Sequence, residues 1–368
     1  MLLELLCTCA ILAAPAAPAN SVRQDAALVL RADKLLLGDG TTLEGGAILI
    51  EGGRIRAFGK DVDVPAGAGT ITHNGWVSAG LVALHSYAGA PDEMSDGTRP
   101  VLEGKVAWAF DPAHSDFAKA LAAGVTTIVL APQPDALCGG ASAVVKTAGR
   151  NVLADEAQLA LSFSAAALSP NRFPTSYASA VAELDTRFDK PEGLFARAKS
   201  GELPVLFDAD TREDVLRVLG FAKRHSLRGA IYGADWIGEL APQVKASQLA
   251  AIISPLDAGE DRRTLKSVVA LAKADVPFGF GLDSPFKDPQ TLRLSAALCL
   301  REGLDRARAW RALSSQAAQI AGVGDRVGRI EKGLDADLVL WSGDPLDLKS
   351  RVDAVLVDGQ RVYEAKQP

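Results

Sequence analysis

The middle of the chain alternates between short apolar runs and longer segments whose apolar residues recur with helical spacing. The runs are LVALH (81–85), TTIVLAP (126–132), VVK (144–146), LALSF (159–163), PVLFD (204–208), GAIYG (229–233), LAAIIS (249–254) and PFGFGLD (277–283). Short apolar runs separated by helical patterns are typical of strand–helix units. The pattern therefore predicts about eight strand positions.

The segments between these runs carry helix signals. In residues 211–225, Thr211 and Asp214 resemble a capping box, and three basic residues fall in the last turn. Residues 261–275 repeat the apolar periodicity. Residues 76–327 are therefore predicted to form a (β/α)8 TIM-like barrel, in which catalytic groups lie at the C-terminal strand ends. His85 and Asp283 both occupy such ends.

Both ends of the chain have a different pattern. Residues 26–75 and 328–368 contain short β-rich runs divided by turn residues, including Gly52-Gly53 and Asp358-Gly359. We expect these two regions to form one composite β-sandwich domain. The fold class predicted is α/β, a TIM-like barrel plus a small β-sandwich built from both termini.

The first residues predict export. Residues 1–19 form an apolar segment that ends in Ala17-Pro18-Ala19, a signal-peptide pattern with cleavage before Asn20. We expect a periplasmic or extracellular protein, and a lipid anchor on Cys9 is the less favoured alternative. The apolar run is too short to span a bilayer. Cleavage would leave Cys138 and Cys299, which predicts buried apolar thiols and no disulfide framework.

Charge narrows the classes of partner. The net charge is -6 with 39 Lys and Arg residues against 45 Asp and Glu residues, and no basic run is present. Nucleic-acid binding is therefore not expected. A small molecule or another protein is the expected partner.

Several motifs resemble the amidohydrolase superfamily, in particular its imidazolonepropionase-like branch. They are Ser78-Ala79-Gly80-Leu81 before His85, AAGVTTIVLAP from Ala122, Leu282-Asp283-Ser284-Pro285, and a Gly-x-x-Ala-Asp-Leu-Val-Leu core at 333–340. The resemblance implies hydrolysis of non-peptide C–N bonds by water bound to one or two divalent metals. The implied ligands are a His-x-His after strand 1, a His after each of strands 5 and 6, and an Asp after strand 8, with a bridging Lys or Glu in some members.

The chain departs from this ligand pattern. Only His85 and Asp283 match it. Tyr87 replaces the second His of the first pair, Asp208 lies at the strand-5 position, and Gly233 or a neighbour lies at the strand-6 position. The other histidines, at 73, 114 and 225, fall away from the predicted strand ends. These replacements remove most of the nitrogen donors that the resemblance implies.

The remaining metal candidates are His85, Asp208 and Asp283, with Lys146 as a further candidate. This mixed nitrogen and oxygen set suits Mg, Mn or Ca better than a catalytic zinc site. We expect no cofactor, and the alternative is one divalent ion, Zn, Mn or Fe.

Each candidate has a structural alternative. His85 could be hydrogen-bonded in the barrel mouth, and Asp283 could cap the turn into a helix near 288. Asp208 is interpreted as a loop carboxylate or helix cap in preference to a ligand. Tyr87 is expected to be an aromatic of the substrate cleft, and Lys146 a salt-bridge or surface residue.

Two functional hypotheses follow. The favoured one is a non-catalytic amidohydrolase-fold protein that binds a ligand or pairs with an active homologue, as a homo-oligomer or hetero-oligomer. The alternative is an active hydrolase with a reduced mononuclear or metal-free site, in which Asp283 is the base and His85 polarises the substrate.

Overall fold

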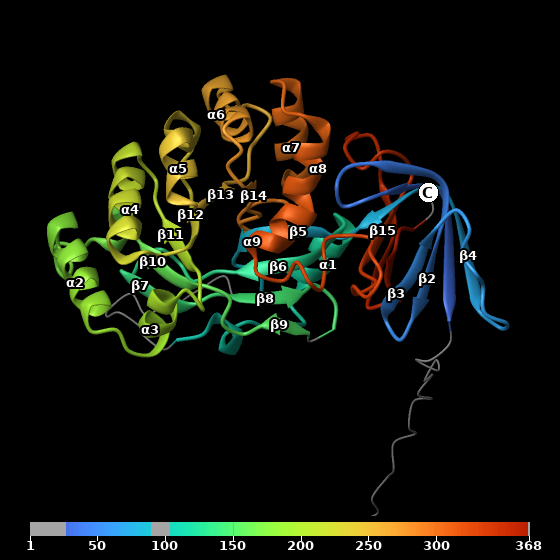
Figure 1. The fold of residues 1–368 in the computed structure, drawn as a ribbon, viewed down its shortest axis with the longest axis horizontal. Helices are drawn as coiled ribbons and strands as arrows, with labels where there is room; N and C mark the ends of the chain where they lie inside the picture. The colour runs from blue at the N-terminus through green and yellow to red at the C-terminus, as the bar shows by residue number, and fades with distance from the viewer. Residues whose placement is uncertain (1–26, 90–103, 150, 367–368) are drawn as a thin grey trace, which may run out of the picture.

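The computed structural model describes residues 27–89, 104–149 and 151–366. The predicted signal peptide, with Cys9, lies outside the described residues. The strands form three sheets. In Figure 1, two of them lie inside an arc of helices that runs from α2 to α8, and the third forms a separate β-region beside this arc.

The β-region is one seven-stranded sheet in the order β17-β16-β15-β4-β1-β2-β3. Its strands are β1 (Leu28–Leu36), β2 (Thr42–Glu51), β3 (Arg54–Gly59), β4 (Gly69–Ala79), β15 (Leu338–Trp341), β16 (Val352–Val357) and β17 (Gln360–Glu364). The antiparallel pairing of β15 with β4 joins strands from the two ends of the chain.

This sheet curls around its own core. The amide of Ile55 donates to the carbonyl of Leu334 at 2.9 Å, and that of Ala336 donates to Gly53 at 2.8 Å. These bonds bring β3 to the segment before β15, so residues of both halves share one apolar cluster. The core of the β-region thus lies within a single curled sheet, where the sequence suggested a sandwich.

The other two sheets contain all eight apolar runs of the central region. One has the order β5-β6-β8-β9 and the other β14-β13-β12-β11-β10-β7. The bounds are β5 (Leu81–Ser86), β6 (Val125–Leu130), β7 (Cys138–Ala141), β8 (Ala143–Lys146), β9 (Val152–Ala154), β10 (Leu159–Ser162), β11 (Val205–Asp208), β12 (Gly229–Tyr232), β13 (Ala250–Ile253) and β14 (Phe278–Phe280).

The prediction of uniformly parallel strand–helix units is wrong at the third position. β8 pairs with β6 antiparallel. The described connection between them, residues 131–142, contains β7 and no helix. Parallel neighbours are usually joined by a crossover helix, and this connection forms β7 instead of a helix.

The two sheets are neighbours at both of their sides. At one side the amide of Leu282, just after β14, donates to the carbonyl of His85 at 2.7 Å. At the other side Ser142 alone separates β7 from β8, and its amide donates to the carbonyl of Gln158 at 2.9 Å. The first junction places the ends of β5 and β14 side by side.

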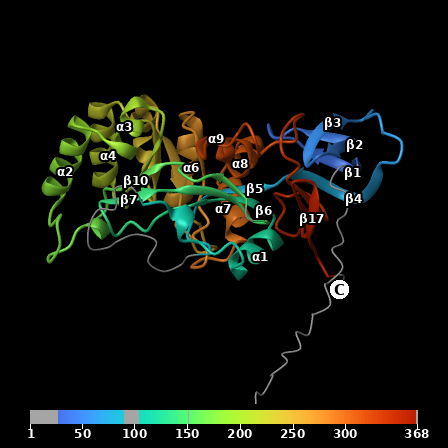
Figure 2. The ribbon, with the colours of Figure 1, turned by 90° about the horizontal axis from the view of Figure 1, so that it is seen from below.

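Helices cover the outside of the strands, as Figure 2 shows from below. The α-helices are α1 (Ser115–Ala122), α2 (Tyr177–Asp189), α3 (Gly193–Ser200), α4 (Arg212–His225), α5 (Ala241–Ser247), α6 (Arg262–Lys273), α7 (Thr291–Arg301), α8 (Arg306–Leu313) and α9 (Ser315–Ile320). Short 3-10 turns are η1 (Val106–Trp108), η2 (Ala165–Ala167) and η3 (Ile237–Leu240). None of the described helices is long and apolar enough to cross a bilayer.

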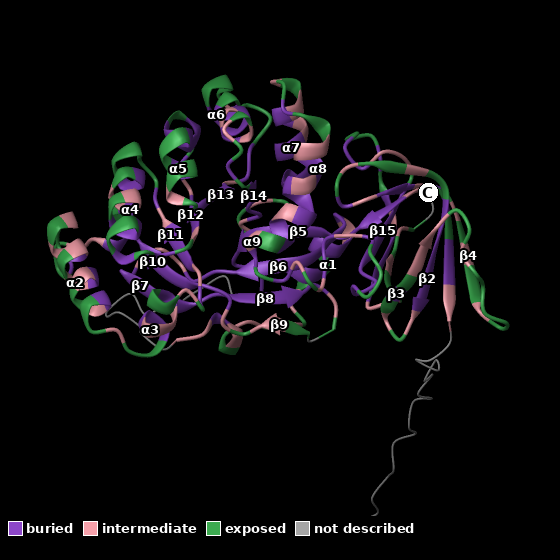
Figure 3. Cartoon of the chain, in the orientation of Figure 1, coloured by how far each residue is buried: buried purple, intermediate pink, exposed green. Residues whose placement is uncertain are grey.

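Helix α4 illustrates how the sequence sets these elements. The Thr211 hydroxyl accepts from the amide of Asp214, and the Asp214 carboxylate accepts from the amide of Thr211, which confirms the predicted capping box. The helix buries one face and exposes the other, the pattern that Figure 3 shows along the arc. Cys138 and Cys299 are buried, as predicted, and burial raises the pKa of the Cys299 thiol to about 12.

Candidate functional site

His85 lies at the C-terminal end of β5 and is 3% exposed. Its Nδ1–H donates to Oδ1 of Asp283 at 2.7 Å. Every residue of β5 is buried, so the strand holds the imidazole inside the protein. The two sequence candidates that match the family pattern are thus in direct contact.

Asp283 follows β14 in the left-handed backbone region, with φ of 50°. Its amide donates to the carbonyl of His85 at 3.1 Å, so the backbone also ties the two segments together. Helix α7 has Gln290 as its N-cap and no side-chain cap bond, and both carboxylate oxygens of Asp283 bond to His85 and Tyr232. The alternative that Asp283 caps this helix is therefore wrong.

Tyr232, the last residue of β12, completes the contact. Its hydroxyl donates to Oδ2 of Asp283 at 2.5 Å. Its ring stacks on the imidazole of His85 with centroids 3.6 Å apart and an interplanar angle of 10°. Burial, and then the charge of Asp283, raise the pKa of Tyr232 well above its ordinary value, so the phenol stays protonated.

Tyr232 is the site residue that the sequence interpretation missed. The strand-6 position was assigned to Gly233 or a neighbour, and the structure places Tyr232 there. The signal was present, because a tyrosine ends the apolar run 229–233. The residue type gave no reason to expect a contact with His85.

Tyr87 is the aromatic neighbour on the other side of His85. It is 8% exposed, and its ring meets the imidazole edge-on with centroids 5.1 Å apart. Phe286 packs against it at 5.7 Å. Burial and the charge of Asp283 raise the pKa of the Tyr87 phenol. The second imidazole of the family pattern is thus replaced by part of an aromatic cluster.

Asp208 faces the same space. Its Oδ2 accepts from the hydroxyl of Ser162 at 3.1 Å, and burial raises its pKa to about 6. With His85 and Tyr232 it lines a cavity of about 20 Å³, room for roughly one water molecule. Thr211 caps the following helix, so the cap interpretation of Asp208 is wrong.

These residues do not fit the metal centre that the family resemblance implies. Within the described residues, no group of three or more His, Cys, Asp or Glu side chains could hold a metal ion. Both oxygens of Asp283 and Nδ1 of His85 are engaged in hydrogen bonds, and the Tyr232 ring covers one face of the imidazole. An open catalytic zinc site generally needs three protein ligands.

Lys146 lies away from this site. Its side chain is fully buried and its ammonium pairs with Asp335 at 2.8 Å, Asp337 at 3.1 Å and Asp358. Burial lowers the pKa of Lys146, but the charge of Asp337 and the bonds to the other two acids outweigh it and raise the pKa. The salt-bridge interpretation of Lys146 is confirmed and the surface interpretation is wrong.

The other three histidines have partners elsewhere. His73 lies 2.9 Å from the carbonyl of Trp341, and His114 caps α1. His225 ends α4 and lies 2.7 Å from Asp185. None of them reaches His85, as the sequence indicated.

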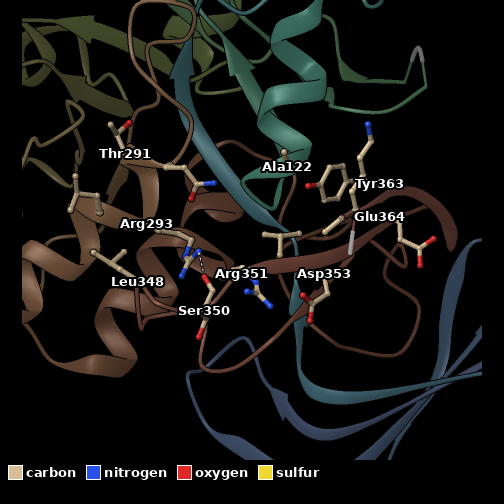
Figure 4. A pocket seen from close by; sticks show the side chains of 14 residues that line it. Ala122, Thr291, Arg293, Leu348, Ser350, Arg351, Asp353, Tyr363 and Glu364 are labelled. Carbon is tan, nitrogen blue, oxygen red and sulfur yellow. Dashed lines mark hydrogen bonds between the residues drawn. The ribbon is translucent and has the colours of Figure 1, made fainter. Parts of the chain in front are cut away.

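The cavity at the strand ends is small, and a larger one lies elsewhere. A groove of about 1020 Å³ lies between the start of α7, the end of α1 and strands β16 and β17. Figure 4 shows the side chains that line it. Its buried cation, Arg293, donates to the carbonyls of Pro345, Asp347 and Ser350 and so fastens the loop before β16. Size alone does not make this groove the reactive site, because its titratable groups do not converge.

Comparisons with known proteins agree on one class. The profile described as "Amidohydrolase family" matches residues 195–363. The amidohydrolase tasK of Hapsidospora irregularis is 33% identical over 82 residues, which cover 22% of this chain and 8% of that protein. The imidazolonepropionase of Stenotrophomonas maltophilia is 38% identical over 95 residues, 24% of this chain and 23% of that protein. The chain thus spans less than a quarter of either curated relative.

Solved structures share the fold over nearly the whole chain. An amidohydrolase from Thermotoga maritima MSB8 superimposes with a TM-score of 0.83 at 21% identity, covering 92% of this chain and 100% of that one. Phenylurea hydrolase B gives a TM-score of 0.66 at 16% identity, covering 92% and 97%. The fold is therefore that of the amidohydrolases, a mixed α/β region with an attached β-domain. The chain is thus similar to amidohydrolases in sequence over residues 195–363 and in fold over nearly its whole length.

Proposed function

We propose that this chain is a non-catalytic amidohydrolase of the imidazolonepropionase-like branch, and that it acts as a ligand-binding or partner subunit. The two central sheets, adjacent at both sides, would then form one closed TIM-like barrel. The observation that carries the proposal is the position of Tyr232, stacked on His85 and bonded to Asp283. These are the two residues that match the family's metal ligands.

The chemistry of the contacts supports this proposal. A general base needs a free acceptor aimed at its substrate, and both Asp283 oxygens already accept strong hydrogen bonds. The adjoining cavity of about 20 Å³ holds roughly one water and no substrate. The Tyr232 hydroxyl thus takes the place beside Asp283 that a metal ion would take in an active relative.

Elemental analysis of protein purified without chelator tests the proposal. We expect less than about 0.1 equivalent of Zn, Mn, Fe or Ni in the wild-type chain. A matched variant, Tyr87→His/Asp208→His/Tyr232→His, restores an imidazole at each departing position and serves as the positive control. We expect it to bind about one equivalent of zinc. Stoichiometric metal in the wild-type chain would refute the proposal.

A reduced active site is the second candidate. The observation that favours it is the retained His85–Asp283 pair, 2.7 Å apart at adjacent strand ends. Asp208, with a pKa of about 6, could exchange a proton near neutral pH. Under this alternative, His85→Ala and Asp283→Ala each abolish metal binding and hydrolysis of amide, lactam or carbamate substrates. Wild-type protein without such hydrolysis would leave the non-catalytic proposal standing.

We also propose that the chain is exported and works as an oligomer. The apolar leader and its Ala17-Pro18-Ala19 site support export. N-terminal sequencing of the protein from the exported fraction should begin at Asn20. Light scattering of the purified chain, alone and mixed with an active homologue, would show whether it associates with itself or with that partner.

A further inference from the structure

A second cavity lies beside the strand-end site and shares no lining residue with it. Its volume is about 400 Å³, and it opens between the start of α4 and the segment 234–240 that follows β12. This volume is within the range of small-molecule pockets, about 300–1,000 Å³. The cavity can therefore accept a ligand that the space beside His85 cannot.

The floor of this cavity is apolar. Val215, Ile237 and Leu240 line it and are almost fully buried, with exposures of 0%, 3% and 1%. Trp236 forms one side and is 45% exposed. An exposed tryptophan over a buried aliphatic floor offers a surface for the hydrocarbon part of a ligand.

The charged residues of the cavity are mainly acidic. Its lining contains the carboxylates of Asp210, Glu213, Asp235 and Glu239 and the guanidiniums of Arg212 and Arg263. Arg263 already has partners, because it pairs with Glu239 at 2.5 Å and stacks over the Trp236 ring at 4.3 Å. It therefore does not neutralise the other acids of the cavity. The stacking contact shows that the Trp236 ring accepts a guanidinium.

Asp210 and Asp235 differ from the paired acid. Among the residues that the structure describes, neither has a Lys or Arg nitrogen within ion-pair distance. Asp210 lies against the segment after β12, because a Cβ atom at Gly233 would be 3.4 Å from its Oδ1. Two carboxylates without a cation thus border the same apolar cavity.

The neighbours of Asp210 and Asp235 are also acidic. Burial raises the pKa of both side chains, and acidic neighbours raise it further: Asp214 for Asp210, and Glu260 with Asp210 for Asp235. A cation placed between them would stabilise both ionised forms.

We propose that this cavity binds an organic cation, with its guanidinium or ammonium group between Asp210 and Asp235 and its hydrocarbon part on Trp236. Charge-assisted hydrogen bonds to the two carboxylates would select the positive charge. The buried aliphatic floor would select a ligand with an apolar stem. This site is independent of the metal question and goes beyond the proposed function.

Calorimetric titration with Nα-acetyl-arginine amide tests the site, with Nα-acetyl-citrulline amide as the neutral ligand of matched shape. We expect saturable binding of the arginine derivative at one site, and at least about tenfold weaker binding of the citrulline derivative. Equal affinity for the two compounds, or no saturation by about 10 mM, would overturn the proposal.

Variants locate the binding. Asp210→Asn/Asp235→Asn should weaken binding of the arginine derivative at least about tenfold, and Trp236→Leu should weaken it a few-fold by removing apolar contact. Asp257→Asn is the control, because Asp257 pairs with Lys287 outside the cavity, and it should bind as the wild type does. Unchanged affinity in the double variant would contradict the proposal. If its thermal midpoint falls, Asp235→Asn alone, on an exposed loop, replaces it with the same expectation.

A peptide distinguishes the two sources of such a cation. Acetyl-Ala-Arg-Ala-Ala-amide would bind more tightly than the single amino-acid derivative if the cation is a side chain of a partner protein. Equal or weaker binding would assign the cavity to a free small molecule. Both outcomes require the Asp210 and Asp235 carboxylates.

Discussion

Two regions of the molecule bury carboxylates, and they neutralise them differently. Between the β-region and β8, three aspartates surround the fully buried ammonium of Lys146. At the strand ends, Asp283 is held by the uncharged phenol of Tyr232 and by His85. The first region relies on a fixed cation and the second on hydrogen-bond donors.

This difference shows which part of the family's architecture can change without loss of the fold. Removing the ammonium of Lys146 would leave the buried carboxylate of Asp337 without a cation, whereas Asp335 would keep Arg326. At the strand ends, a hydrogen-bonding aromatic ring takes over the contacts around Asp283 and fills the space. Under the non-catalytic proposal, the carboxylate of Asp283 therefore keeps hydrogen-bond partners without a metal ion.

The largest effect is expected for Lys146→Met. The substitution leaves Asp335, Asp337 and Asp358 without their shared cation, and we expect a loss of about 3–5 kcal/mol in the free energy of unfolding. Urea denaturation at pH 7 measures it. Adding Asp337→Asn to this variant should recover part of the loss, because it removes one of the surplus negative charges.

Lys287→Met is the matched control. Lys287 pairs with Asp257 on the surface, where their side chains are 40% and 54% exposed. Its loss should cost at most about 1 kcal/mol. Equal losses for the two lysine variants would mean that the buried cluster is not held by its cation.

An intermediate effect is expected for Tyr232→Phe. This change keeps the ring on His85 and removes only the donor to Asp283, so it should cost about 1.5–3 kcal/mol in unfolding free energy. Tyr363→Phe is the control, since the Tyr363 hydroxyl bonds to no other residue in the described part of the chain, and it should change stability by less than about 0.5 kcal/mol. If Tyr232→Phe lowers the free energy of unfolding as little as the control does, the Tyr232 hydroxyl does not stabilise the fold.

The smallest effect is expected for Asp208→Asn and depends on pH. The pKa of Asp208 is about 6 in the folded protein and about 3.9 in an unfolded chain. The folded state thus binds the proton more tightly, and wild-type stability from this group falls as pH rises from about 4 to about 6. An asparagine side chain does not ionise, so the variant keeps its stability as the pH rises through this range. We expect the variant to gain about 1–3 kcal/mol over the wild type at pH 7.5 and little at pH 4.

Urea denaturation of both proteins at the two pH values checks this prediction. Asp337 has a raised pKa of about 6 as well, because burial outweighs the attraction of Lys146. It contributes equally to both proteins and cancels in their difference. A difference that does not depend on pH would show that Asp208 is not protonated preferentially in the folded state.

The sequence predicted elements better than contacts. All eight apolar runs of the central region form strands, and the capping box of α4 is present, because these features depend on local pattern. The antiparallel direction of β8 was missed, since the connection from β6 forms β7 where a parallel pair would usually have a crossover helix. Pattern identifies a strand, and its neighbours decide its direction.

The candidate site shows the same limit. The strand-end positions of His85 and Asp283 followed from the order of the runs, and the structure places them 2.7 Å apart. The role of Tyr232 could not be predicted, because stacking on an imidazole depends on how two strands far apart in sequence are placed side by side. Asp208 was interpreted as a loop carboxylate or a helix cap for a similar reason, since its contact with Ser162 leaves no local signal in the sequence.

The pairing of Ser78 in β4 with Val339 in β15 also constrains how the protein is made. During synthesis, the N-terminal strands leave the ribosome long before the strands that complete their sheet. Until then one edge of β4 is open and apolar residues such as Leu30 and Ile48 lack part of their cover. The β-region can reach its final form only after nearly the whole chain has been translated, and nascent chains stalled before β15 should be prone to aggregation.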